Sequence, residues 1–104
     1  MSVAIESTLI MQMSAAYNTH FMQSANAGEA LIHMMQICDS LHPKLKNIQP
    51  KEILVLLSHG KSFNSRAQLR NFAIDVIIYL VADVVGSNYS QAELVEVVSQ
   101  RITR

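Results

Sequence analysis

Histidine and cysteine are the side chains of this sequence best suited to bind a metal or to act as a nucleophile. A helix places two metal ligands on one face when they lie three or four residues apart, and no two histidines have that spacing. Cys38 follows His33 by five positions, so the two point in different directions. The four histidines are His20, His33, His42 and His59. We predict no metal site, and expect His42 and His59 near helix C-termini, where positive charge is favourable.

The other groups suited to catalysis also lack a suitable arrangement. Cys38 lies beside Ile37 and Leu41 on the apolar side of a predicted helix, where a free cysteine acts as a small hydrophobic residue. Asp75 and Asp83 are eight residues apart, roughly 12 Å along a helix, which is too far for carboxylates that share a proton. The three glycines are at least 26 residues apart, so no glycine-rich phosphate loop is present. We therefore expect neither an enzymatic activity nor a cofactor.

Charge is unevenly distributed along the chain, although eight basic and eight acidic residues cancel. Residues 1–43 carry a net charge of −3, residues 44–70 of +5 and residues 71–104 of −2. Such a pattern indicates electrostatic contacts by the middle block, to nucleic acid, to a protein or to the acidic residues of the chain itself. Six side chains are the predicted contacts: Lys44, Lys46, Lys51, Lys61, Arg66 and Arg70.

Residues 50–71 have the proportions of a helix-turn-helix. The second helix would present Arg66, Gln68, Arg70 and Asn71, residue types that pair with base edges in the major groove. Two features oppose this interpretation. The proposed recognition helix runs directly into the most apolar segment of the chain, and the net charge of zero lacks the basic excess of a nucleic-acid binder. A small dimeric DNA-binding regulator is therefore the alternative prediction.

Methionine is concentrated in the first 35 residues, which contain all six. Methionine is frequent at adaptable binding surfaces, and several of these residues flank the main apolar stripe of two N-terminal helices. An apolar arc wider than a helical hairpin needs indicates a second surface to bury, either in a homodimer or against a protein partner. The predicted partner face comprises Ile10, Met11, Met22, Ile32 and Met35. Glutamate at positions 11 and 22 should then split the assembly.

Apolar residues recur at helical spacing throughout the chain, which predicts five helices and no strand. The predicted helices span residues 3–24, 26–42, 50–58, 64–85 and 90–102, and the first two form a hairpin. Asn26, Asn64 or Ser65, and the Ser90–Glu93 capping box mark starts, while Pro43, Gly60 and Gly86 mark ends. In the long fourth helix Ile74, Ile77, Val81 and Val84 should be buried, and Asn64 and Gln68 accessible.

Length and composition complete the prediction of class. A chain of 104 residues with 50% hydrophobic and 15% charged residues is one folded all-α domain covering residues 1–104. The most apolar run, Phe72–Val85, contains two aspartates and is shorter than the ~20 residues of a membrane span. A lone cysteine favours a reducing, cytoplasmic environment. The prediction is a non-enzymatic protein-interaction module of the adaptor, chaperone or inhibitor type.

Overall fold

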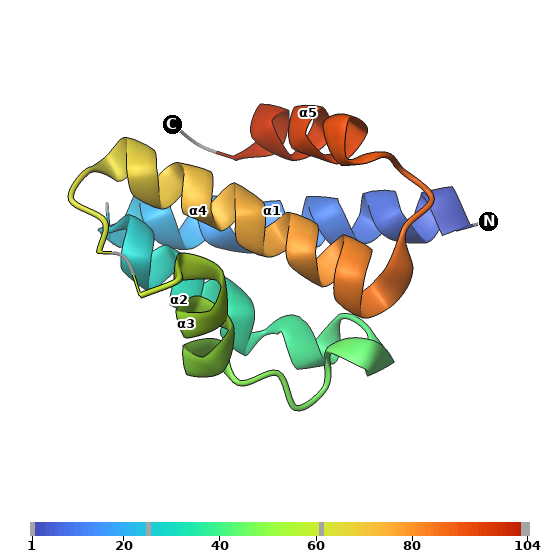
Figure 1. Ribbon diagram of the computed structural model, residues 1–104, viewed down its shortest axis with the longest axis horizontal. Coiled ribbons are helices and arrows are strands. Elements are labelled where there is room, and N and C mark those ends of the chain that lie inside the picture. The colour runs from blue at the N-terminus through green and yellow to red at the C-terminus, as the bar shows by residue number, and fades with distance from the viewer. Residues whose placement is uncertain (1, 25, 61, 103–104) are drawn as a thin grey trace.

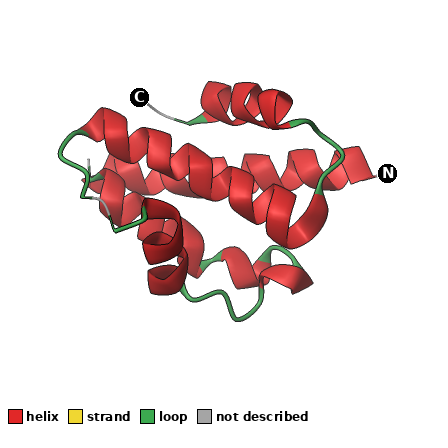
Figure 2. Cartoon of the chain, viewed as in Figure 1, coloured by secondary structure: helices red, strands yellow, loops and turns green. Residues whose placement is uncertain are grey.

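Five α-helices form the computed structural model, which describes residues 2–24, 26–60 and 62–102. They are α1 (Ser2–Ser24), α2 (Ala27–Gln36), α3 (Pro50–Ser58), α4 (Arg66–Tyr79) and α5 (Gln91–Arg101). The described part of the chain contains no strand (Figure 2), so the all-α prediction is confirmed. The radius of gyration of 12.6 Å matches the roughly 13 Å of a compact domain of this length.

Side-chain caps start three of the helices where the sequence predicts. Asn26 Oδ1 accepts from the Glu29 N–H at 3.0 Å, and Ser65 Oγ accepts from the Gln68 N–H at 3.1 Å. At α5 the Ser90 hydroxyl accepts from the Glu93 N–H, while the Glu93 carboxylate accepts from the Ser90 N–H. These bonds satisfy N–H groups that have no partner within a helix.

The second helix is shorter than predicted, because α2 ends at Gln36 rather than before Pro43. Two 3-10 turns follow, η1 (Cys38–Ser40) and η2 (Pro43–Leu45). Ser40 Oγ donates to the Ile37 carbonyl at 2.8 Å, a local side-chain bond that competes with helix continuation. The tighter turns bring Leu45, which is fully buried, back onto the core.

The fourth helix also departs from the prediction in its second half. From Leu80 to Gly86 the helical path widens into a π-helical segment, η3, and ends at Gly86 with φ 103°, as predicted for that glycine. Ile74, Ile77 and Val81 are buried and Asn64 and Gln68 are exposed, as expected. Val84 is half-buried, so its predicted burial is wrong, because the wider turn carries it toward the edge of the core.

α4 lies across the middle of the molecule and organises the other helices around it (Figure 1). α5 packs along one side, α2 and α3 lie on the other, and α1 runs along the back, where α1 and α2 form the predicted hairpin. Buried residues of α1, α2, α4 and α5 meet in one core. In the described ranges, no helix has both the length and the apolar character needed to cross a membrane.

Candidate interaction surface

Two residues of the predicted partner face lie in the core instead. Ile10 is fully buried and Met35 is 2% exposed, so neither is available to a partner, and the prediction is wrong for both. The physical reason is that α1 and α2 pack against α4 as well as against each other, and α1 packs against α5 too. Most of the wide apolar arc of α1 and α2 is therefore buried inside the chain itself.

The other three residues are exposed but belong to different surfaces. Met11 and Met22 share one face of α1 with Asn18, because residues four, seven and eleven positions apart return to the same side of a helix. Asn18 Nδ2 donates to the Arg101 carbonyl at 2.6 Å, so this face borders α5. Ile32, which is 41% exposed, lies on α2 beside α3. The predicted set is not one continuous patch.

The outward face of α3 is the most unusual surface of the described chain. No residue of this nine-residue helix is buried. Its exposed positions follow helical spacing: Lys51, Glu52, Val55 and Leu56. His59, which ends the helix in a left-handed conformation, is exposed next to them. Val55 is 67% exposed and Leu56 54%, so the centre of this face is apolar where a surface helix normally carries polar residues.

A groove of about 250 Å³ runs beside this apolar centre, between α2, α3 and the start of α4. Its lining is almost entirely apolar: Gly28, Leu31, Ile32, Leu54, Val55, Ser58, Phe63, Leu69 and Phe72. Phe63 and Phe72 stack with ring centroids 4.7 Å apart, which fixes part of the lining. Ile32 and Val55 line the groove and are themselves exposed, so groove and helix face form one surface.

Val55 and Leu56 are not among the residues predicted for the partner face, although the sequence contains a signal for their exposure. Residues 53–57 are five consecutive apolar positions, and five consecutive residues of a helix point in all directions around its axis. One face of such a helix must therefore stay apolar toward solvent unless the helix is enclosed on all sides.

Three of the six predicted contact residues of the basic block contact neutral groups of the chain itself, namely backbone carbonyls and an aromatic ring. Arg70 Nη2 donates to the carbonyls of Ser99 at 2.8 Å and Ile102 at 3.3 Å. Arg66 lies over the Phe21 ring at 4.7 Å, and Lys44 Nζ donates to the Val85 carbonyl at 3.4 Å.

The other three predicted contacts of the block are Lys46, Lys51 and Lys61. Lys46 and Lys51 are exposed. Lys61 lies outside the described residues, so its predicted contact stays a prediction.

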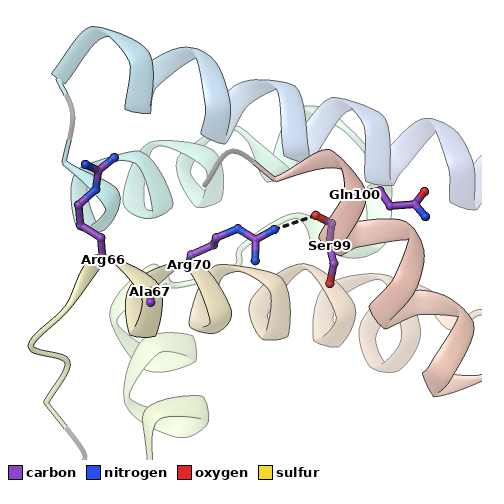
Figure 3. Close-up of a pocket in the computed structure, with 5 residues that line it drawn as sticks. All are labelled: Arg66, Ala67, Arg70, Ser99 and Gln100. Carbon is purple, nitrogen blue, oxygen red and sulfur yellow. Dashed lines mark hydrogen bonds between the residues drawn. The ribbon is translucent and has the colours of Figure 1, made fainter.

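The predicted recognition helix does not present its four residues together. Arg66 and Arg70 extend from α4 toward α1 and α5 (Figure 3), and half-buried Arg70 is bonded there. Gln68 and Asn71 instead line a separate pocket of about 430 Å³ together with Asp75. Burial raises the pKa of the Asp75 carboxyl, yet an acidic group on this side opposes a phosphate backbone. The prediction that these four residues share one base-reading face is therefore wrong.

The structure also shows where the histidines lie relative to one another and to the helix ends. His20 and His33 stack with ring centroids 4.7 Å apart, a tertiary pair that their spacing did not reveal. Among the described residues no three His, Cys, Asp or Glu side chains gather to hold a metal. His59 ends α3 as expected. The prediction that His42 lies at a helix C-terminus is wrong, because its Nδ1 accepts from the Lys44 N–H and so caps the start of η2.

Cys38 is fully buried, and its thiol donates to the Met34 carbonyl at 3.3 Å. Burial, and secondarily the charge of Asp39, raises its pKa to about 12. A thiol in this environment stays protonated, so it packs as an apolar group.

Comparison of the chain with models of protein families, with curated proteins and with solved structures finds no match.

Proposed function

We propose that this chain is a non-enzymatic protein-interaction module that self-associates through the outward face of α3, with a second copy of the chain as the occupant. The observation that carries the proposal is the exposed apolar centre, Val55 and Leu56, on a helix with no buried residue. Burial of this centre removes apolar surface from water, which is the main driving force of association. A small domain of this size also has little stability to spare.

The order of residues along the face favours a second copy over an unrelated partner. When two α3 helices pack antiparallel around a two-fold axis between Val55 and Leu56, the apolar centres meet. Positions 52 and 59 are equally far from that axis, so Glu52 faces His59 of the partner subunit. The imidazole N–H can donate to the carboxylate, and no like charges oppose each other. A two-fold interface requires such self-complementarity.

The neighbouring groove supports the same arrangement. It is lined by Ile32 and Val55 and lies next to the ridge formed by Leu56. A two-fold axis pairs the same surface patch of both copies. Leu56 of each copy therefore lies near the groove of the other copy. Apolar side chains that fill apolar pockets at the centre of an interface contribute most to its affinity.

Sedimentation equilibrium at micromolar concentration tests the proposal. The wild-type chain should show twice its mass of 11.6 kDa. Leu56→Glu should raise the dissociation constant by about tenfold or more, because a carboxylate would be desolvated in an apolar interface. Met22→Glu is the matched control, since Met22 is 75% exposed on another helix face. Self-association through α3 replaces the assembly expected through positions 11 and 22, so this substitution should leave the mass unchanged.

Three results would contradict the proposal: a monomeric wild-type chain, an unchanged mass for Leu56→Glu, or dissociation caused by Met22→Glu. Circular dichroism of each variant checks that the helices persist. Tight, sequence-selective binding of a DNA duplex would favour the alternative, a small dimeric DNA-binding regulator. The lone free thiol of Cys38 supports our placement of the module in a reducing compartment such as the cytoplasm.

A further inference from the structure

A second surface, away from α3, has an arrangement suited to a small ligand. It is an open pocket of about 730 Å³ between the start of α4 and the end of α5 (Figure 3). Its lining consists of Arg66, Ala67, Arg70, Ser99 and Gln100. Two of these side chains are cations and the other three are neutral, so the pocket has a concentrated positive charge in a chain whose net charge is zero.

Arg70 is held in place without losing its charge. Its Nη2 donates to two backbone carbonyls, those of Ser99 and Ile102. Its Nε is enclosed and has no hydrogen-bond partner in the described structure. Carbonyl oxygens carry only a partial negative charge, so these contacts orient the guanidinium but leave most of its positive field available.

Arg66 is the accessible cation of the pair. Its guanidinium lies 4.7 Å above the Phe21 ring, and Phe21 in turn stacks on Tyr17 with centroids 6.1 Å apart. A cation–π contact of this kind is made without using the N–H donors of the guanidinium in a hydrogen bond, so these donors stay available to a ligand. The aromatic pair therefore orders an exposed side chain that would otherwise sample many rotamers.

Both charges act on the same region of the protein. Tyr17 has its pKa raised by burial, and the positive charges of Arg70 and Arg66 oppose that rise. Both arginine side chains extend from the side of α4 that faces α1 and α5 (Figure 3), and the charges of both act on the Tyr17 hydroxyl.

We propose that this pocket binds the oxyanion group, carboxylate or phosphate, of a small organic ligand. Guanidinium groups form strong, oriented, charge-assisted hydrogen bonds with such groups. The volume lies within the range of small-molecule sites, about 300–1,000 Å³, so the ligand has a body beyond its anionic group. Arg66 makes the direct contact, and Arg70 adds its field from a fixed position. The pocket shares no residue with the α3 face, so this inference stands independently of the self-association.

Two-dimensional NMR of the ¹⁵N-labelled chain tests the proposal, with inorganic phosphate and acetate as separate probes at constant ionic strength. We expect saturable shifts of the Arg66, Ala67 and Arg70 amides with at least one probe, relative to chloride. The probe that binds more tightly distinguishes a phosphate ligand from a carboxylate ligand. Linear, non-saturable changes with both probes would overturn the proposal.

Substitutions separate a pocket from general attraction of anions. Arg66→Ala should weaken binding by about tenfold or more, the loss expected for one charged hydrogen bond, and Arg66→Lys should restore part of it. Lys46→Ala removes an exposed positive charge from another part of the chain and should leave the affinity unchanged. An equal loss in the two alanine variants would contradict a specific site.

Discussion

Arg70 of α4 donates from Nη2 to the Ser99 carbonyl of α5 at 2.8 Å, across 29 residues of sequence. The same nitrogen also contacts the Ile102 carbonyl, and Asn18 of α1 donates to the Arg101 carbonyl. The last carbonyls of a helix have no partner within that helix, so side chains from two other helices cap the end of α5. The C-terminal helix is thereby tied to both neighbours by polar contacts as well as by apolar packing.

Arg70→Met should therefore destabilise the chain by roughly 1.5–3 kcal/mol, the contribution of hydrogen bonds to a charged group. Methionine retains the apolar stem of the side chain and removes its donors. Urea denaturation measures the change, and hydrogen exchange should show faster opening of the α5 amides. Arg101→Met is the matched control, because Arg101 is exposed, and it should change stability little. Equal stability of the two variants would show that the cap is energetically unimportant.

Ile77→Ala should lower the free energy of unfolding by roughly 2–5 kcal/mol. Ile77 is fully buried on α4, so its truncation leaves a cavity at the centre of the core. Val95→Ala, at a position that is 43% exposed on α5, should cost far less. Chemical denaturation of both variants tests the prediction, and a near-neutral effect at position 77 would place the core elsewhere.

The helices were predictable because local chemistry marks their ends. Asn26, Ser65 and Ser90 each accept the hydrogen bond that starts a helix, and the apolar spacing of α4 identifies its buried side. The early end of α2 and the π-helical η3 were missed. Both depend on tertiary fit, since Leu45 must reach the core and the path after Tyr79 must widen.

The candidate sites were less predictable than the helices. Which part of a wide apolar arc stays exposed depends on how many helices cover it, so Ile10 and Met35 were misplaced on the surface. The partners of Arg66 and Arg70 lie 45 and 29 residues away in sequence, and no spacing rule brings Phe21 or Ser99 to them. The apolar run that exposes Val55 and Leu56 was visible, but its meaning depended on α3 lying at the edge.

The raised pKa of the Cys38 thiol predicts that the folded chain loses stability at alkaline pH. Its pKa is about 12 in the folded chain, above the 9.0 of an ordinary thiol, so the folded state retains a proton that the unfolded state releases. The contribution of the thiol is complete below pH 9 and is lost as the pH rises toward 12. Denaturation at a series of pH values should show this decline, and Cys38→Ala should show a shallower one. Tyr17, whose pKa is also raised, is unchanged in both chains, so the difference isolates the thiol. Identical slopes would contradict the assignment.

Thiol cross-linking across the α3 face tests the central claim most directly. Glu52→Cys and His59→Cys chains are prepared separately, and the buried Cys38 does not compete for a short bifunctional maleimide. Antiparallel pairing places position 52 of one copy opposite position 59 of the other, so the mixture should give a covalent dimer far faster than either variant alone. Equal rates in all three samples, or no covalent dimer in the mixture, would contradict self-association through α3.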